Sequence, residues 1–410
     1  MTIDLDLDLG SASVRADPYP LFTRLREAAP AFRSARLRGW VLTRYADVHA
    51  ALNDPRLSAD RITPFVDHVA GEDESPLAAF ARALGLWAVF RDPPDHTRLR
   101  AAMNRAFTAG AVERLAPAIA DLVDGFLDKV MARGEMDLIG ELAYPLPVAV
   151  IGMLLGVPPA DFARLKAWSD ELAMVVGTAL DSHDKHARAA RSWQEMRDYF
   201  GALIAARHAA PAADALGDMI RARQAEARLD DAELVANAVL LLFAGHETTT
   251  NLIANAVLAL IRDPAALARL RREPALVESA VEEFLRYDGP VQALTRIARS
   301  PLEVQGKRIA AGERVILVLN AANRDPRQFP EPERLRLDRE PNRHIAFGYG
   351  IHFCLGAPLA RLEAKIALPR IVARLPELAL AEERLEWIDS LVFRGMRSLK
   401  VSFRAHEPAL

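Results

Sequence analysis

The longest hydrophobic pattern in the chain covers residues 231–262 and predicts one long helix. Asp230 precedes this pattern as an N-cap residue, and Glu233 follows at the third helical position, which is the signature of a capping box. The side chains of residues 234–244 are apolar on almost every face, so this half of the helix is expected to be buried all round. At about 1.5 Å per residue, such a helix is long enough to cross a whole domain.

Polar side chains interrupt this helix at residues 244–250, which read Ala-Gly-His-Glu-Thr-Thr-Thr. Unpaired polar groups inside a buried helix are costly, and threonine hydroxyls there can bond back to carbonyl groups and bend the helix. His246-Glu247 also begins a pattern like that of zinc proteases, but position 250 is threonine rather than histidine, so this alternative fails. A functional reason for the polar groups is therefore expected.

Shorter hydrophobic patterns predict a mainly α-helical fold with a minor β-sheet. Apolar positions at helical spacing predict further helices at residues 18–29, 45–52, 92–107 and 274–287, and a succession of helices separated by prolines at 111–226. Alternating patterns predict a hairpin at 32–42 that turns at Arg38-Gly39, strands at 291–298 and 302–319, and a hairpin-like segment at 387–401.

The composition is that of an ordinary soluble globular protein, with 51% hydrophobic and 26% charged residues. A net charge of -3 gives no electrostatic case for nucleic acid as a partner. The first residues are acidic and alternating, unlike a signal peptide, and the longest apolar run, residues 238–245, is far shorter than the about 20 residues of a membrane-spanning helix. With one cysteine there is no internal disulfide, so a cytoplasmic protein without a membrane anchor is expected.

The only cysteine, Cys354, lies in the segment 347–356, which reads Phe-Gly-Tyr-Gly-Ile-His-Phe-Cys-Leu-Gly. Its glycines allow positive φ angles and a close approach to a flat group. A helical pattern with Pro358 in its first turn follows directly, so the sulfur is expected at a helix N-terminus, where the thiolate that binds metals is favoured. A lone cysteine is more often a small buried hydrophobe, but the three placed glycines argue against that alternative.

This segment resembles the cysteine loop of the cytochrome P450 haem-thiolate monooxygenases, Phe-Gly-x-Gly-x-His-x-Cys-x-Gly, at every fixed position. In that family the cysteine thiolate binds the haem iron. The resemblance implies a haem b cofactor (iron protoporphyrin IX) with Cys354 as its metal ligand and Phe347, Gly348 and Gly356 among its binding residues. It also implies one cytochrome P450 domain over residues 1–410, with haem between the long central helix and the helix after the cysteine.

The polar segment of the long helix is similar to the family's Ala-Gly-x-Asp/Glu-Thr element. The resemblance implies that Ala244 and Gly245 leave a groove for dioxygen and that Glu247 and Thr248 relay protons. The chemistry needs both groups, because a hydroxyl can hydrogen-bond a reacting oxygen while a carboxylate takes up protons from solvent. The structural alternative is a threonine-rich kink of the helix.

Two further sets of residues match family elements. His96 and Arg100 share one helix face, where such a pair is commonly solvated. The resemblance instead implies that haem propionates are bound by four residues: His96, Arg100, Arg296 and His352. Glu283 and Arg286 would by themselves suggest a surface ion pair. The resemblance implies a buried structural triad of Glu283, Arg286 and Arg339.

Residues 56–92 show no sustained period and predict a long irregular connection that could act as a lid over the substrate pocket. By resemblance, the pocket is expected to be lined by six apolar residues: Leu84, Trp87, Val291, Leu294, Leu391 and Val392. An apolar lining of this kind suits many small hydrophobic substrates and does not name one.

The resemblance therefore implies a monooxygenase of the soluble bacterial type that inserts one atom of dioxygen into a small hydrophobic substrate. The chain has no flavin or iron-sulfur motif of its own, so electrons are expected from a ferredoxin and its NAD(P)H-dependent reductase. Arg98, Arg105 and Arg361 could offer a docking charge, although solvated surface arginines are the plainer explanation. A non-catalytic haem sensor and a peroxide-driven enzyme are the alternatives, and neither would need the pair Glu247-Thr248.

Overall fold

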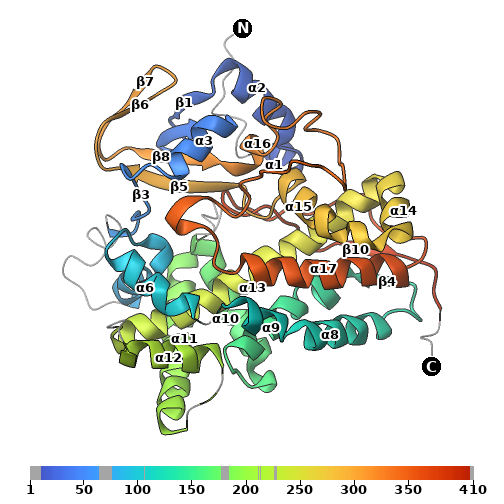
Figure 1. Ribbon diagram of the computed structural model, residues 1–410, viewed down its shortest axis with the longest axis horizontal. Helices are drawn as coiled ribbons and strands as arrows, with labels where there is room; N and C mark the ends of the chain where they lie inside the picture. Colours follow the sequence, from blue (N-terminus) through green and yellow to red (C-terminus); the bar gives the residue numbers. More distant parts are fainter. Residues whose placement is uncertain are drawn as a thin grey trace.

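The computed structural model describes residues 11–63, 76–105, 107–176, 184–210, 212, 214–225 and 229–406. Helices make up most of this part of the chain, and the strands gather in small sheets. In Figure 1 the largest sheet and the first helices lie at the top, and most of the other helices lie below them. The prediction of a mainly α-helical fold with a minor β-sheet is confirmed.

The helices are close to the predicted ranges. Up to residue 225 they are α1 (Ala12–Ala16), α2 (Tyr19–Ala28), α3 (Tyr45–Leu52), α5 (Pro76–Leu84), η1 (Ala88–Phe90), α6 (Asp95–Asn104), α7 (Ala109–Glu113), α8 (Ala116–Asp128), η2 (Ile139–Ala143), α9 (Pro145–Leu154), η3 (Pro159–Asp161), α10 (Phe162–Val176), α11 (Lys185–Ala209) and α12 (Ala215–Ala225). The later helices are α13 (Asp231–Arg262), α14 (Pro264–Arg272), η4 (Pro274–Leu276), α15 (Val277–Tyr287), α16 (Leu319–Ala322), η5 (Gly350–His352) and α17 (Ala357–Arg374).

The largest sheet has five strands in the order β1-β2-β8-β5-β3. Its strands are β1 (Ala31–Ser34), β2 (Gly39–Leu42), β3 (Leu57–Ser58), β5 (Ala293–Ala298) and β8 (Arg314–Val318). A second sheet joins β4 (Glu135–Asp137), β10 (Lys400–Ser402) and β9 (Ala379–Leu380), and a third pairs β6 (Leu302–Val304) with β7 (Lys307–Ile309). Alternate residues of β8 face opposite sides, so Val315 and Leu317 pack near α3 while Ile316 and Val318 pack near α2.

The first hairpin turns earlier than predicted. Gly39 is already part of β2 and is the partner of Ser34, so the turn occupies residues 35–38, with Arg38 at a positive φ of 49°. The glycine at position 39 serves the sheet instead, because a Cβ atom there would lie 2.8 Å from the carbonyl oxygen of Arg314 on the neighbouring strand β8. The sequence pattern located the hairpin, and the contact with a distant strand explains the glycine.

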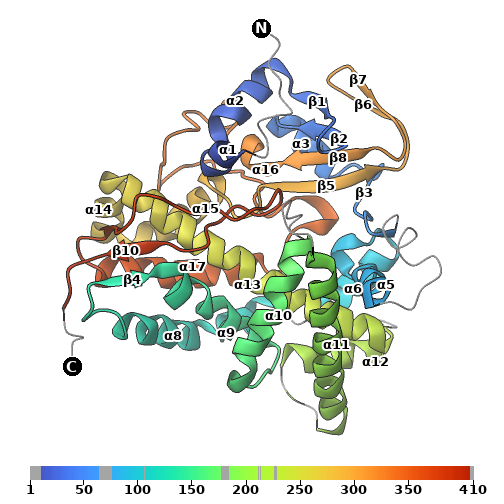
Figure 2. The ribbon, with the colours of Figure 1, turned by 180° about the vertical axis from the view of Figure 1, so that it is seen from behind.

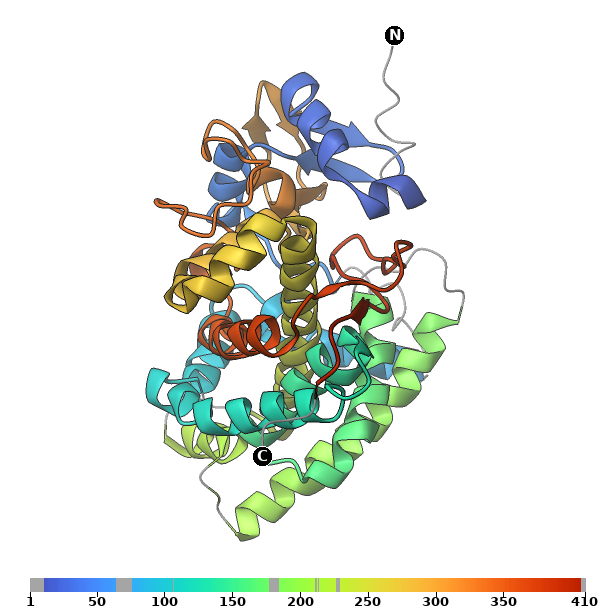
Figure 3. The ribbon, with the colours of Figure 1, turned by 90° about the vertical axis from the view of Figure 1, so that its right-hand side faces the viewer.

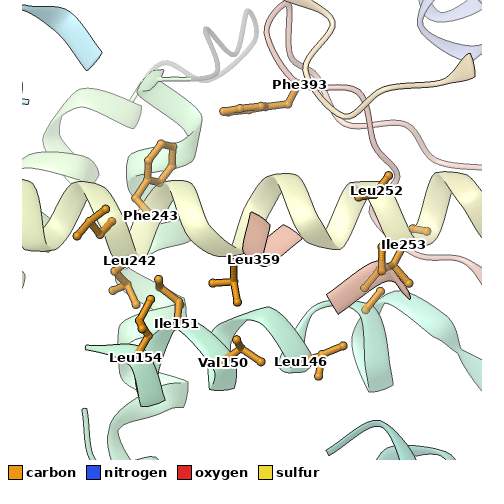
Figure 4. Packing of buried hydrophobic residues seen from close by; sticks show 14 of the residues in the cluster. Leu146, Val150, Ile151, Leu154, Leu242, Phe243, Leu252, Ile253, Leu359 and Phe393 are labelled. Carbon is orange, nitrogen blue, oxygen red and sulfur yellow. The ribbon is translucent and has the colours of Figure 1, made fainter. Parts of the chain in front are cut away.

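The long helix α13 has the predicted bounds and lies in the middle of the helical part of the molecule. Its capping box is formed, since Asp230 accepts from the Glu233 amide at 2.7 Å and Glu233 accepts from the Asp230 amide at 3.1 Å. Helix α17 contacts α13 and lies across its direction in Figure 3, and Figure 4 shows apolar side chains of α9 and α13 facing one another. The expected burial of residues 234–244 on every face is confirmed for 234–243 and is wrong for Ala244, which is exposed.

The stretch 56–92 contains more regular structure than predicted. Its described part forms the strand β3, the helix α5 and the short helix η1, and residues 64–75 lie outside the described residues. The helix α5 packs on α11 through Phe80 and other buried residues. A helix of only 9 residues is marginal by itself, so α5 depends on this tertiary packing for its stability.

Within the described residues, the search for membrane-spanning helices finds no single helix that is long and apolar enough. Only α13 and α14 taken together reach the required length and composition, and the two helices meet at an angle of 108°.

Glu363 is a carboxyl group buried within the fold. It lies on α17, and neither carboxyl oxygen has a hydrogen-bond partner among the residues that the structure describes. Burial raises the pKa of Glu363 well above its ordinary value, because the charged form cannot be solvated there. The neutral acid is therefore the form that the fold accommodates.

The substitution Glu363→Gln is expected to stabilise the protein, and more strongly as the pH rises. A raised folded-state pKa contributes stability that is complete below the ordinary glutamate pKa and is lost as the pH rises through the folded-state pKa. Glutamine cannot ionise, so the variant should melt higher than the wild type by about 2 °C or more at about pH 8 and by less at about pH 5. Thermal unfolding measured over this range, with the exposed Glu303→Gln as control, tests this; a difference that does not change with pH would contradict it.

Candidate active site

The cysteine loop, residues 347–356, places Cys354 directly before α17. Gly348 and Gly350 adopt positive φ angles of 72° and 73°, and a Cβ atom on Gly350 would lie 2.8 Å from Oδ1 of Asn53. The Cys354 amide donates to the carbonyl oxygen of Phe347 at 3.0 Å, which closes the loop. Gly356 differs from the expectation: its φ is -79°, so it does not need the freedom of glycine in the left-handed region.

Burial and the neighbouring donors and charges shift the pKa of the Cys354 thiol in opposite directions. Burial raises the pKa of Cys354, while the amides of Gly356 and Ala357 and the charges of Arg100 and Arg361 lower it. The helix N-terminus thus acts in the expected direction, but burial outweighs it. Coordination to a metal ion would reverse this balance, because a metal binds and stabilises the thiolate.

Basic side chains from three separate elements gather next to this loop. His96 comes from α6 and His352 from η5, and their ring centroids lie 4.1 Å apart. Arg100 of α6 donates from Nη2 to the carbonyl oxygen of Phe353 at 2.6 Å. Burial and then the nearby charges of His96, Arg296 and Arg100 lower the pKa of His352 to about 3. The four residues expected to bind propionates therefore act on one another electrostatically.

This basic group has few acidic partners in the described part of the chain. Among the described residues, Asp92 is the carboxylate that raises the pKa of His352, and it is already bonded to Ser58 and Arg299. Nε2 of His352 is buried and has no hydrogen-bond partner among the described residues. Buried cations and unpaired donors of this kind fit a bound anion, so the residues present fit the two propionates of a haem.

Sequence analysis missed one further cation here. The Arg61 guanidinium lies 4.7 Å from the centre of the Phe90 ring. Burial and the charges of Arg296 and Arg314 lower the pKa of Arg61 to about 10. Only spatial proximity marks this residue, because the sequence around it carries no pattern that points to a site.

Between residues 233 and 261 of α13, Ala244 is the only exposed residue, and Thr248 on the same face is half-buried. Ala244 is exposed although its neighbours in sequence up to Phe243 are buried. Thr248 donates from its hydroxyl to the Ala244 carbonyl oxygen at 3.3 Å, and Thr249 makes the same bond to Gly245. The expected back-bonding is confirmed, yet α13 continues as an α-helix through this segment. The open face is where a helix lined by small and hydroxyl side chains can meet a bound molecule.

Gly245 has a packing reason of its own. A Cβ atom at this position would lie 2.8 Å from Cγ1 and 3.0 Å from Cδ1 of Ile151 on α9. Helices α9 and α13 therefore approach closely because position 245 has no side chain. Figure 4 shows Ile151 directed toward α13.

Glu247 lies partly buried beside a second charged group. Burial and then the charge of Asp170 raise the pKa of Glu247, Asn251 and Lys166 lower it, and the result is a pKa of about 7. Asp170 comes from α10, which packs against α13 (Figure 2). A carboxyl group with a pKa near neutrality can hold and release a proton under ordinary conditions.

Glu283, Arg286 and Arg339 meet in the interior. Arg286 donates to both carboxylate oxygens of Glu283 at 2.7 and 2.8 Å, and Nε of Arg339 lies 3.1 and 3.0 Å from the same oxygens. All three side chains are buried. The remaining donors of both arginines bond carbonyl groups of residues 323–334, so this arrangement holds the segment that leads to the cysteine loop.

The six apolar residues expected to line the pocket differ in how far they are buried. Leu84, Trp87 and Val392 are buried, whereas Val291, Leu294 and Leu391 are partly exposed. Two aromatic residues that sequence analysis missed join them: the Phe243 ring lies 5.6 Å from Trp87 and 6.4 Å from Phe393. Figure 4 shows Phe243 and Phe393 near the same stretch of α13. The sequence offered one indication of their role, since each is the direct neighbour of an expected site residue, Ala244 or Val392.

Comparison with known proteins agrees with this geometry. The family model described as "Cytochrome P450" matches residues 65–384. The cytochrome P450 monooxygenase PikC of Streptomyces venezuelae is 40% identical, over 97% of this chain and 94% of its own. The vitamin D(3) 25-hydroxylase of Pseudonocardia autotrophica is 41% identical, over 96% of both chains. The crystal structure of CYP109E1 from Bacillus megaterium in complex with testosterone superposes with a TM-score of 0.85 at 34% identity, over 96% of this chain and 99% of that one.

Fold and site thus define a haem-dependent oxygenase, and the chain belongs to the cytochrome P450 family. It is a monooxygenase that inserts one atom of dioxygen into a small organic substrate, with a haem cofactor and electrons from an external redox partner. Membership of this family decides against the non-catalytic sensor that the sequence left open. The relatives are bacterial proteins.

The close approach at Gly245 predicts a coupled effect of two substitutions. Gly245→Ala is expected to lower the free energy of unfolding by about 1–3 kcal/mol, because the added methyl group overpacks against Ile151. In the Ile151→Ala background the same change should cost less or stabilise by up to about 1 kcal/mol, since alanine is the better helix former. Chemical denaturation of the four proteins of this double-mutant cycle measures the difference. An equal cost of Gly245→Ala in both backgrounds would show that Ile151 does not set the requirement for glycine.

Proposed function

We propose that the protein is a haem b monooxygenase of small hydrophobic molecules in which Cys354 binds the iron and Glu247 and Thr248 deliver protons. One observation carries this proposal: the only cysteine lies just before α17, beside a group of buried and half-buried basic residues that lacks enough acidic partners in the described chain. We also propose that residues 1–410 form one domain, because α13 contacts helices from both halves of the chain.

Haem, when bound, supplies the redox chemistry that activates dioxygen. In the proposed arrangement, His96, Arg100, Arg296 and His352 bind its propionates by charge-assisted hydrogen bonds. Phe347, Gly348 and Gly356 belong to the loop that would lie against the ring. The basic group therefore fixes the cofactor at its edge while the Cys354 thiolate holds the iron. The triad of Glu283, Arg286 and Arg339 keeps the supporting segment in place without touching the reacting atoms.

Proton delivery in this proposal uses two neighbouring residues with different chemistry. Glu247 exchanges a proton near neutral pH because burial raises its pKa to about 7. The Thr248 hydroxyl now donates to the Ala244 carbonyl and can rotate to donate to a reacting oxygen instead. The exposed face of Ala244 beside Thr248 leaves space for that oxygen.

The substrate class is proposed from the apolar residues around α13. Phe243 and Phe393, which are the sequence neighbours of Ala244 and Val392, form an aromatic wall. Val291 is joined to Phe393 by a β-bridge. Leu294 and Leu391 are close to these two residues in sequence, and like Val291 they are partly exposed. Trp87 packs against Phe243, with ring centroids 5.6 Å apart, and Leu84 is buried in the same hydrophobic cluster. The names of two relatives, a vitamin D(3) 25-hydroxylase and a protein solved with testosterone, are in line with a compact hydrophobic substrate.

A ferredoxin with its NAD(P)H-dependent reductase is the proposed electron source, and a cytoplasmic location follows from that proposal. The three arginines expected to dock a redox partner differ in whether an acidic residue of the chain binds them. Arg98 is bound to Glu233 at 2.5 and 2.7 Å, and Arg361 is bound to Glu282 at 2.7 and 2.8 Å. Their charges are thus neutralised within the chain, and the exposed Arg105 remains as the candidate for docking a ferredoxin.

The ligand of the iron can be read from a spectrum. The reduced wild-type protein with carbon monoxide is expected to show the strongly red-shifted Soret band of thiolate-ligated haem. Cys354→His should lose this band, because imidazole donates less electron density to the iron than a thiolate. Visible spectroscopy of both purified proteins checks this. A wild-type spectrum typical of histidine-ligated haem would remove Cys354 from the proposed role.

The role of Thr248 is tested by the ratio of product formed to NAD(P)H consumed. Thr248→Ala is expected to reduce this ratio by about tenfold or more, with hydrogen peroxide formed instead, since positioned proton donors contribute about 10²–10⁴-fold to a rate. Thr249→Ala is the matched control, because Thr249 makes the same back-bond to the helix from a buried position. Full coupling in Thr248→Ala would contradict the assigned proton delivery and favour a peroxide-driven enzyme.

A further inference from the structure

A cluster of three potential metal ligands lies between α10 and α13. A ring nitrogen of His246 and carboxylate oxygens of Asp170 and Glu247 all lie within 4.8 Å of one another. The residues come from two helices that contact each other, as Figure 2 shows for α10 in front of α13. The cluster shares Glu247 with the proposed active site and adds His246 and Asp170, to which the proposed function assigns no role.

His246 is oriented as a metal-binding histidine. Its Nδ1 lies 2.9 Å from the carbonyl oxygen of Leu242, and because a carbonyl only accepts, Nδ1 carries the proton. The lone pair is then on Nε2, the nitrogen left free to bind a metal ion. This atom is buried and has no partner among the described residues, in a side chain that is only 1% exposed. Metal-binding histidines almost always donate their other ring nitrogen to a carbonyl or carboxylate in this way.

The two carboxylates keep oxygen lone pairs free for a cation. Asp170 accepts from the Tyr144 hydroxyl at 2.6 Å on one oxygen and from the Lys166 ammonium at 2.8 Å on the other. Among the described residues, Glu247 accepts one hydrogen bond, a long one of 3.4 Å from Asn251. Each carboxylate oxygen has two lone pairs, so these bonds leave capacity on both residues.

The cluster is also reachable from solvent. The side chains of Asp170 and Lys166 are 43% and 45% exposed, so an ion can enter on the α10 side. The Lys166 ammonium now neutralises part of the acidic charge and can turn outward when a doubly charged ion takes its place. The Tyr144 hydroxyl would remain on Asp170 and orient that ligand.

We propose that Asp170, His246 and Glu247 bind a zinc ion, and that zinc bound there stops proton delivery by Glu247. One imidazole and two carboxylates are a ligand set that zinc accepts, with a water molecule in the fourth position. Magnesium and calcium prefer oxygen ligands alone and are disfavoured by the imidazole. A metal-bound carboxylate cannot hold a proton, so the inhibitory effect rests on the proposed function of Glu247, whereas zinc binding itself does not.

Calorimetric titration of zinc into the holoenzyme, after treatment with a chelator, tests the site. The wild type is expected to bind one zinc ion per chain, and His246→Gln and Asp170→Asn should each weaken this binding by about tenfold or more. The exposed His208→Gln is the matched control and should bind like the wild type. Magnesium titrated in the same way should give no binding. Equal zinc affinity in all four proteins would overturn the site, and because Asp170 is half-exposed, its variant decides the matter even if His246→Gln fails to fold.

A second measurement separates this inference from the proposed function. Zinc is expected to lower the product formed per NAD(P)H in the wild type to the level of Glu247→Gln, and to leave Glu247→Gln unchanged. If zinc binds as described but coupling does not change, the site stands and the role of Glu247 in proton delivery is wrong. If Glu247→Gln is uncoupled but zinc neither binds nor inhibits, the proposed function stands and the zinc site is wrong.

Discussion

The fold depends on one constraint, which is that α13 is enclosed along most of its length. A helix surrounded on all sides must present mostly apolar side chains, and residues 234–243 do so except at Asn237, whose side chain is hydrogen-bonded to Leu86 and Ala88. Close enclosure also sets the size of individual side chains, as at Gly245, where Ile151 of α9 leaves no room for a Cβ atom. Polar residues on such a helix must each find a partner or a function, because leaving them unpaired would cost about 1–3 kcal/mol apiece.

The polar segment of α13 meets that requirement in two directions. On one side, Thr248 and the exposed Ala244 form the face that suits oxygen chemistry. On the other side, His246 and Glu247 point into the contact with α10, where Asp170 raises the pKa of Glu247 after burial has done so. The carboxyl group that would deliver protons is therefore controlled by a second helix, and any ion or residue that changes Asp170 would change the chemistry on the far side of α13.

At the cysteine loop, too, the charged groups have few partners of opposite charge. His96, Arg296 and His352 come from a helix, a strand and a loop, yet they act on one another because the fold brings them together with one carboxylate, that of Asp92. Burying like charges together is unfavourable unless an anion joins them. The haem-binding role proposed for these residues follows from this imbalance. Glu363 shows the contrasting solution on α17, where a single buried acid stays neutral.

Short-range patterns in the sequence were sufficient for the long helix, its capping box, the cysteine loop and the order of the family's motifs, because those features depend on neighbouring residues. The tertiary structure alone decided the others. It showed that Gly39 and Gly245 are required by distant neighbours, that Gly356 is not in the left-handed region, and that part of the stretch 56–92 is helical. It also paired Asp170 with His246, 76 positions later. Contacts between residues so far apart depend on how helices pack, and local hydrophobic periodicity carries no record of that packing.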